Sequence, residues 1–172
     1  MAKRYRKYLP FLAVAGIVLL DQLTKYWAMT DLFERGEIPV IPGVFYFTFA
    51  TNNGAAWSML AGRRVILLAV TVVALSLIVY ILKKQWVDKP LGRWGIYFVL
   101  GGAIGNLLDR AFRAGGLVVD FLDFRLINFP IFNVADSFIT VGGILFAVYV
   151  LLTAIHDAGQ KKSSEDGDTH ED

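Results

Sequence analysis

Two aspartates, Asp120 and Asp136, are the residues of this chain best suited to chemistry. Asp136 stands at the mouth of a hydrophobic segment, since the 19 residues that follow it, 137–155, carry no charge. Asp120 lies sixteen positions earlier, in the apolar run Val118-Val119-Asp120-Phe121. A carboxylate at the edge of the hydrocarbon costs about 2.5–3.5 kcal/mol on insertion scales, so it marks a functional site by default. Together the two suggest acid–base chemistry at a membrane surface.

Desolvation and mutual repulsion would raise the pKa of one carboxyl group and leave one shared proton on the pair. The ionised carboxylate could then take a proton from a water that attacks a peptide carbonyl, while the protonated one polarises that carbonyl. We therefore predict a pair of the aspartic-protease type, which needs no cofactor and no metal ion. In the alternative, Asp120 is a loop carboxylate paired with Arg113 or Arg125. Asp123 is a rival carboxylate that we expect to be solvated.

Other nucleophiles and metal ligands are scarce in this sequence. It contains no cysteine, which excludes disulfides, a thiol nucleophile and thiolate metal sites. The two histidines, His156 and His170, lie in or beside the polar C-terminal segment, away from the aspartates. A Ser-His triad or a histidine-ligated metal is therefore not expected.

The composition predicts a small integral membrane protein. Of its 172 residues, 56% are hydrophobic and only 19% are charged, which is too apolar for a soluble domain of this size. The uncharged run 65–82 would give a helix of about 27 Å, close to a bilayer core of roughly 30 Å. We predict an all-α polytopic membrane protein whose single membrane-embedded domain, 1–156, has four transmembrane helices at about 9–29, 65–82, 94–110 and 133–155.

The charge pattern indicates how the chain lies in the membrane. Four basic residues precede the first span and four more, ending at Arg93, lie in or beside the short loop between the second and third. The positive-inside bias places both on the cytoplasmic side, with both termini inside and the loops 30–64 and 111–132 outside. A cleavable signal sequence is disfavoured because Asp21 and Lys25 interrupt the first apolar run.

Two segments outside the predicted helices, residues 38–49 and the C-terminal tail, have compositions of their own. Residues 38–49 are rich in aromatic and β-branched residues and bounded by proline and glycine, which predicts short strands lying on the membrane. The tail, 157–172, is mostly Ser, Gly, Asp and Glu. It cannot bury enough apolar surface to offset the entropy of ordering, so we predict a disordered cytoplasmic tail.

Polar residues recur at helical spacing in the third and fourth spans. Asn133, Asp136, Ser137 and Thr140 form one polar stripe that must face protein or water. In the third span, Asn106 and Asp109 fall on one face that ends at Arg110, beside the small-residue surface Gly101-x-x-x-Gly105. These residues could serve the site or could merely hold helices together, and the pattern does not decide between the two.

Two further groups allow a structural and a functional interpretation. Asp21 and Lys25, spaced i,i+4, favour an ion pair that orients the first helix, with the lysine reaching toward the outer surface. Asn52 and Gly54 belong to the run Thr51-Asn52-Asn53-Gly54-Ala55-Ala56-Trp57-Ser58, where Asn-Gly predicts a hairpin turn. Alternatively, its small residues permit close backbone approach, and Asn52 could bond to a substrate peptide.

Five motifs together resemble those of the type II, or lipoprotein, signal peptidases of bacteria, and they occur in the family's order. They are Asp21-Gln22-x-x-Lys25, Asn52-x-Gly54-Ala55-Ala56, Gly105-Asn106-x-x-Asp109-Arg110, Val119-Asp120-Phe121 and Phe132-Asn133-x-Ala135-Asp136-Ser137. The resemblance spans roughly residues 9–155. It implies an aspartic endopeptidase of the bacterial inner (cytoplasmic) membrane, with four transmembrane helices, a small extracytoplasmic β-sheet platform and an active site near the periplasmic face.

The resemblance also implies roles, substrates and inhibitors. Asp120 and Asp136 would be the catalytic residues. Supporting or substrate-binding positions would be Asn52, Gly54, Asn106, Arg110, Asn133, Asp21 and Lys25. The enzyme would cleave diacylglyceryl-modified prolipoproteins just before the lipidated cysteine, would contact membrane lipids and would be blocked by globomycin-type inhibitors. We expect a monomer with no nucleic-acid partner.

Two other classes of protein could place carboxylates in a membrane. A proton-coupled transporter would hold them near the bilayer midplane and between internal repeats, and the sequence contains no such repeat. A non-catalytic assembly factor would explain the packing glycines and the polar helix faces without any chemistry. Replacing one aspartate by asparagine separates the three, because only a protease would lose cleavage and keep its fold.

Overall fold

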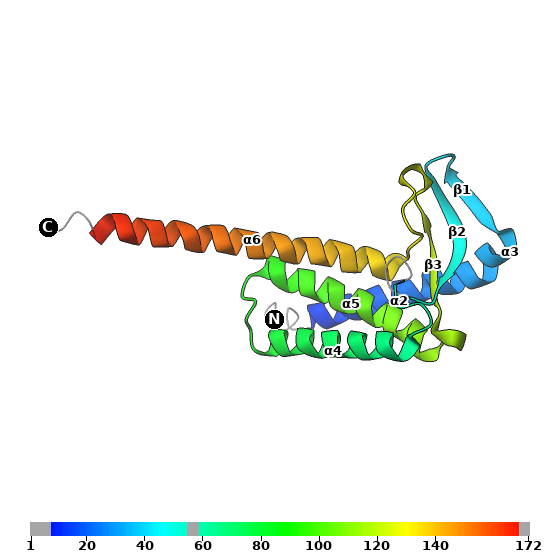
Figure 1. Ribbon diagram of the computed structural model, residues 1–172, viewed down its shortest axis with the longest axis horizontal. Coiled ribbons are helices and arrows are strands. Elements are labelled where there is room, and N and C mark those ends of the chain that lie inside the picture. Colours follow the sequence, from blue (N-terminus) through cyan, green and yellow to red (C-terminus); the bar gives the residue numbers. More distant parts are fainter. Residues whose placement is uncertain (1–7, 55–58, 169–172) are drawn as a thin grey trace.

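The computed structural model describes residues 8–54 and 59–168, with side chains described as far as residue 160. Within these residues, four long helices lie side by side (Figure 1). They are α2 (Leu9–Trp27), α4 (Arg64–Lys83), α5 (Pro90–Phe112) and α6 (Val134–Asp168). Each helix coincides with one of the four predicted hydrophobic segments, and the mostly helical fold is confirmed.

Three of these segments are candidates for membrane spans by their length and composition. In the part of the chain that the structure describes, the stretches long and apolar enough to cross a membrane are Leu9–Arg35, Arg64–Lys83 and Val134–Gln160. Large apolar side chains on them face outward, such as Phe11 at 71% and Val65 at 78% exposure. Such surfaces suit contact with lipid rather than with water. The structure thus identifies three span candidates where the sequence predicts four.

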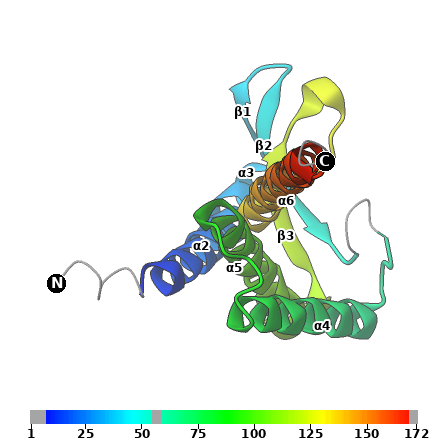
Figure 2. The ribbon, with the colours of Figure 1, turned by 90° about the vertical axis from the view of Figure 1, so that its left-hand side faces the viewer.

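The remaining helix, α5, lies in the middle of the bundle. It contacts α2, α4 and α6, and Figure 2 shows it running between them. Its glycines and the polar Asn106 and Asp109, both buried, lower its hydropathy. This helix therefore faces protein on most sides, which is why composition alone does not mark it as a span.

Glycines set how closely the helices around α5 approach. A β-carbon on Gly101 would lie 2.9 Å from the side chain of Ile17 on α2, and one on Gly105 would lie 2.5 Å from Asp21. On another face of α5, a β-carbon on Gly102 would lie 2.8 Å from Ile139 of α6 and would also collide with the Ala135 carbonyl. The Gly101-x-x-x-Gly105 surface is thus a packing surface for α2, as its spacing predicts.

A three-stranded antiparallel sheet lies at one end of the bundle, opposite the end where α2 begins and α6 ends (Figure 1). Its strands are β1 (Glu37–Ile41), β2 (Phe45–Asn52) and β3 (Val118–Asp123), in the order β1-β2-β3. The short strands predicted within 38–49 are confirmed as β1 and β2. The third strand, β3, was not predicted, although Val118, Val119 and Phe121 supply the usual β-forming residues.

The sheet is fixed to the end of the first helix by apolar packing. After Trp27 the chain continues as a π-helix, η1 (Ala28–Leu32), and a short turn of helix, α3 (Phe33–Arg35). Ala28 and Leu32 form a buried cluster with Val119 and Phe121 of β3. Because Val119 and Phe121 flank Asp120, this packing holds the Asp120 backbone against the bundle.

The final helix runs further than the composition predicts. α6 continues to Asp168, whereas the polar residues 157–172 predict disorder. Extending an existing helix adds one hydrogen bond for each residue fixed and avoids the cost of nucleation, so a polar segment can follow a stable helix in helical form.

Candidate active site

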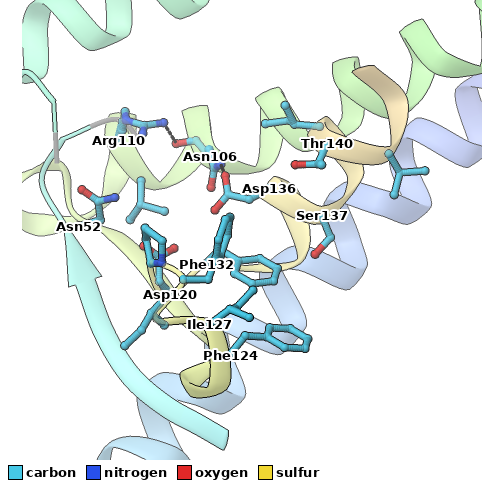
Figure 3. Close-up of a pocket in the computed structure, with 16 residues that line it drawn as sticks. Asn52, Asn106, Arg110, Asp120, Phe124, Ile127, Phe132, Asp136, Ser137 and Thr140 are labelled. Carbon is cyan, nitrogen blue, oxygen red and sulfur yellow. Dashed lines mark hydrogen bonds between the residues drawn. The ribbon is translucent and has the colours of Figure 1, made fainter. Parts of the chain in front are cut away.

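A cavity of about 620 Å³ lies where β3, α5 and the start of α6 meet. Figure 3 shows the side chains of Asp120 and Asp136 directed into this space from different elements. The cavity lining consists of a few polar residues and a mainly apolar wall. It comprises Asn52, Asn106, Arg110, Val118, Asp120, Phe124, Ile127, Phe129, Pro130, Ile131, Phe132, Asp136, Ser137, Ile139, Thr140 and Val141. The two predicted catalytic residues therefore share one cavity.

Asp136 takes part in the hydrogen bonding that starts α6. Asn133 immediately precedes the first helical residue, and its Oδ1 accepts the Asp136 backbone N–H at 2.9 Å. In return, Asp136 Oδ2 accepts the Asn133 backbone N–H at 3.3 Å. This reciprocal pair has the form of a capping box, with aspartate in place of the usual glutamate or glutamine. The carboxylate thus lies at a helix N-terminus, where negative charge is stabilised.

Asp120 approaches from the sheet. It pairs with Ala50 across β2 and β3 and is only 4% exposed. The Asn133 amide Nδ2 donates to Asp120 Oδ1 at 2.6 Å. Burial, and then the charge of Asp136, raise the pKa of Asp120 from 3.8 to about 7. At neutral pH a substantial fraction of this carboxyl group is therefore protonated.

Asn106 completes the contacts of the pair from α5. Its Nδ2 donates to Asp136 Oδ1 at 2.7 Å. Its Oδ1 accepts two hydrogen bonds, from Lys25 Nζ at 2.9 Å and from Asn133 Nδ2 at 3.1 Å. Asn106 and Asn133, which the sequence singled out on two separate helices, are thus joined directly beside the aspartates.

Beneath Asn106 lies a buried group of charges. Lys25 Nζ is 2.9 Å from a carboxylate oxygen of both Asp21 and Asp109, and all three side chains are fully buried. Asp109 also pairs with Arg113 at 2.7 Å. The predicted Asp21–Lys25 pair is confirmed, but the expectation that the lysine reaches the outer surface is wrong. Two carboxylates and an amide oxygen hold it inside, where it compensates their charge.

Asp21 also contacts the site directly. Its Oδ1 accepts the backbone N–H of Ala135 at 2.9 Å. The first turn of a helix has N–H groups without intrahelical partners, so a carboxylate from another helix can satisfy one of them. Asp21 therefore fixes the start of α6, and with it Asp136, against α2.

The alternative partners of Asp120 are engaged elsewhere. In the described residues, Arg113 pairs with Asp109, and Arg125 pairs with Asp123 and Glu37. Asp123 is only 7% exposed and accepts a hydrogen bond from Thr48. The expectation of a solvated Asp123 is therefore wrong, because its carboxylate is buried and accepts hydrogen bonds from Thr48 and Arg125.

Asn52, Gly54 and Arg110 form the remaining polar edge of the site. Asn52 Oδ1 accepts the Gly54 N–H at 2.8 Å, and Arg110 Nη2 donates to the Gly54 carbonyl at 3.0 Å. Arg110 Nη1 also contacts the Asn106 carbonyl at 3.5 Å, the interaction dashed in Figure 3. The rest of that motif, Ala55-Ala56-Trp57-Ser58, lies outside the described residues.

Comparison with known proteins identifies the family. Residues 13–152 match the family described as "Signal peptidase (SPase) II". The chain belongs to the signal peptidase II family. A lipoprotein signal peptidase of Brevibacillus brevis is 49% identical over 137 residues, covering 78% of this chain and 90% of the relative. One of Nostoc sp. is 44% identical over 147 residues, covering 81% and 87%.

A solved structure agrees with this assignment. A bacterial membrane enzyme determined by the in meso method at 2.3 Å resolution superposes with a TM-score of 0.77, at 34% identity, covering 85% of this chain and 89% of that one. This signal peptidase II is therefore a multi-pass membrane peptidase. The transporter and assembly-factor alternatives are not supported.

In this signal peptidase II, the apolar residues that line the cavity were not predicted as part of the site. It comes largely from the segment after β3, namely Phe124, Ile127, Phe129, Pro130, Ile131 and Phe132. The run Phe129-Pro130-Ile131-Phe132 is a recognisable signal, since four consecutive apolar residues in a loop indicate a surface that contacts a ligand, a partner or lipid. In the described residues, no group of three or more His, Cys, Asp or Glu side chains could hold a metal ion.

Proposed function

We propose that this peptidase is an aspartic endopeptidase that removes the signal peptide from diacylglyceryl-modified prolipoproteins, cutting just before the lipidated cysteine. Asp120 and Asp136 are its catalytic residues. The observation that carries the proposal is that one amide, Asn133, hydrogen bonds to both residues at the wall of one cavity. Relatives named lipoprotein signal peptidase support the substrate class.

The chemistry follows from two carboxyl groups that share a proton. The ionised one accepts a proton from a water molecule, whose oxygen forms a bond to the scissile carbonyl carbon. The protonated one donates to the carbonyl oxygen, so that a neutral tetrahedral diol forms. As the diol collapses, the first group protonates the leaving nitrogen and the second recovers its proton, which leaves both groups as they began.

Two polar side chains are suited to hold the peptide next to the pair. Arg110 and Asn52 line the cavity, and Asn52 also hydrogen bonds to Asp120. The guanidinium and amide groups can donate to peptide carbonyls of the substrate. Gly54 bonds to both side chains through its backbone, with its N–H to Asn52 and its carbonyl to Arg110, and so helps to position them. These residues orient the scissile bond, and they do not take part in proton transfer.

The apolar wall supplies a reason for selectivity toward lipidated precursors. Side chains such as Ile127, Phe129 and Val141 present hydrocarbon surface beside Asp136. A diacylglyceryl group whose chains remain in lipid or against this wall avoids exposure to water, worth about 0.8 kcal/mol for each buried CH₂. An unlipidated precursor would lack this contribution.

The same proposal includes the arrangement in the membrane. α5 is the fourth span, enclosed by α2, α4 and α6, and both termini lie on the cytoplasmic side of the bacterial inner membrane. The sheet and the cavity then lie near the periplasmic face, because Figure 1 has the sheet at the opposite end from the start of α2 and the end of α6. The enzyme acts as a monomer, and globomycin-type inhibitors occupy the cavity.

The test is a cleavage assay with purified components. The protein, in lipid or detergent, is mixed with a diacylglyceryl-modified prolipoprotein, and mass spectrometry follows the product. Wild type should release a signal peptide that ends just before the lipidated cysteine, while Asp120→Asn and Asp136→Asn should leave the precursor intact and retain the wild-type fold. An unlipidated precursor serves as the control for selectivity.

Two results would contradict the proposal. If the wild type leaves the lipidated precursor intact in lipid and detergent alike, the substrate class is wrong. If wild type cleaves and both asparagine variants cleave as fast, the catalytic pair is wrong, although the peptidase assignment stands.

A further inference from the structure

The side-chain amide of Asn106 has an orientation fixed by its neighbours. Its two ends differ chemically, since the oxygen only accepts hydrogen bonds and the NH₂ only donates them. One end faces Lys25 Nζ at 2.9 Å and Asn133 Nδ2 at 3.1 Å, and both of these groups are donors. That end must be the oxygen, so the NH₂ group is the end that faces Asp136 Oδ1 at 2.7 Å.

Lys25 is the stronger of the two constraints on this amide. Its ammonium group is fully buried between carboxylate oxygens of Asp21 and Asp109, each at 2.9 Å. With the bond to Asn106, all three of its N–H groups have acceptors. Rotating the amide by half a turn would set its NH₂ against this ammonium group and its oxygen against the Asp136 carboxylate, and both contacts are repulsive.

The two carboxyl groups of the pair differ in what favours their charged forms. Asp136 accepts an N–H on each oxygen, from Asn106 on Oδ1 and from the Asn133 backbone on Oδ2, and it lies at the start of a long helix. Asp120 also accepts hydrogen bonds, from the Asn133 and Asn52 side chains, but it lies within a β-strand and is not itself part of the first turn of a helix. The surroundings therefore favour a negative charge on Asp136 more strongly than on Asp120.

We propose that Lys25 is a positioning residue for catalysis: by fixing the Asn106 amide it makes Asp136 the ionised member of the pair and leaves the shared proton on Asp120. Asp136 is then the base that takes the proton of the attacking water, and Asp120 is the acid that protonates the carbonyl oxygen. This inference rests on the proposed function. The pKa of Asp120, raised to about 7 by burial and then by the Asp136 charge, agrees with a proton held there at neutral pH.

The charged groups around Asp136 come from three elements. Asp120 faces it from β3, Arg110 from α5 and Lys25 from α2. Asp21 and Asp109 lie behind Lys25 and are already paired with it. Removing Lys25 alone would leave two buried carboxylates without their cation, so the single variant would confuse loss of fold with loss of positioning.

The test is therefore a charge-balanced pair of substitutions. Lys25→Met combined with Asp21→Asn removes one buried cation and one buried anion, while the new asparagine can still accept the Ala135 N–H and Asp109 keeps Arg113. We expect this double variant to recover the melting temperature that Lys25→Met alone loses. Its kcat should stay about 10- to 100-fold below wild type, the effect of one hydrogen bond to a charged group. The acidic limb of its pH–rate profile should move to higher pH.

A second variant keeps the test valid if the double variant does not fold. Asn106→Leu has nearly the same shape and adds no charge, and it cannot donate to Asp136. It should show the same displaced acidic limb and the same loss in kcat, with KM little changed. Lys83→Met, on the exposed end of α4, is the matched lysine control and should retain the wild-type profile.

The outcomes separate this inference from the proposed function. If wild type cleaves the lipidated precursor and either folded test variant retains the wild-type kcat and acidic limb, Lys25 has only a structural role and the inference is wrong. If wild type itself does not cleave, or if Asp136→Asn cleaves normally, the proposed function fails first. Displaced acidic limbs in the folded test variants, with an unchanged Lys83→Met, would support the inference.

Discussion

The amide nitrogen of Asn133 lies 2.6 Å from the carboxylate of Asp120, and this buried contact ties strand β3 to the first residues of α6. The oxygen of the same amide accepts the N–H of Asp136. One side chain therefore caps a helix and holds one catalytic candidate at a fixed position relative to the other. Its two roles can be separated by substitution.

Asn133→Ala and Asn133→Ser should separate capping from positioning. Serine can cap the helix as asparagine does, whereas alanine cannot, and loss of a cap costs about 1 kcal/mol. Neither residue can donate across to Asp120 as the amide does. We expect Asn133→Ala to have the lower melting temperature of the two and both variants to lose about 10- to 100-fold in kcat. Equal activity of Asn133→Ser and wild type would show that only the cap matters.

Stability should depend on pH through Asp120. Its pKa rises from 3.8 in the unfolded chain to about 7 in the folded protein, so between these values the folded state binds more protons than the unfolded state. The free energy of unfolding must therefore fall as the pH rises from about 4 to about 7, by at most about 4 kcal/mol from this group. Below pH 4 both states are protonated and the effect is absent.

Melting temperatures in detergent would measure this dependence. Asp120→Asn removes the ionisable group but keeps an oxygen that can accept from Asn133. We expect the variant to melt above wild type at pH 8 and to differ little at pH 4. If the melting temperatures of the variant and wild type differed by the same amount at both pH values, burial of the Asp120 charge would not be the cause of the difference.

Close helix packing at Gly102 should be essential to the site. A methyl group there would collide with the Ala135 carbonyl and lie 2.8 Å from Ile139, so Gly102→Ala must push α6 away from α5 and displace Asp136. We expect the free energy of unfolding to fall by about 1–3 kcal/mol, an amount typical of overpacking. The melting temperature should fall with it, and cleavage should be lost.

Gly143→Ala is the matched control on the same pair of helices. A β-carbon at Gly143 meets no atom within 4 Å, and alanine favours a helix over glycine by about 0.5–1 kcal/mol. We expect unchanged cleavage and a melting temperature equal to or above that of wild type. If both alanine variants behave alike, the close contact between α5 and α6 does not control the site.

Much of the fold could be predicted from the sequence because it depends on local composition. Mostly apolar runs of helical length predict the positions of α2, α4, α5 and α6, and the aromatic and β-branched stretch 38–49 predicts β1 and β2. One element was not predicted. β3 is short and lies in a segment that the sequence analysis assigned to a loop, and it is formed by what packs against it rather than by its own composition. The helix α5 was predicted, but its glycines and polar residues leave it outside the span candidates of the structure.

The residues of the site were predicted from the sequence only in part, for the same reason. The sequence by itself determined that Asp120 and Asp136 border apolar segments, that Asp21 and Lys25 are spaced for an ion pair, and that the five motifs resemble one family. Only the tertiary structure decided that Lys25 is buried beneath Asn106 and that Asn133 joins the two aspartates. Residue types and spacing fix contacts within one helix, but contacts between segments up to 114 positions apart, such as Asp21 with Ala135, depend on how closely the helices pack.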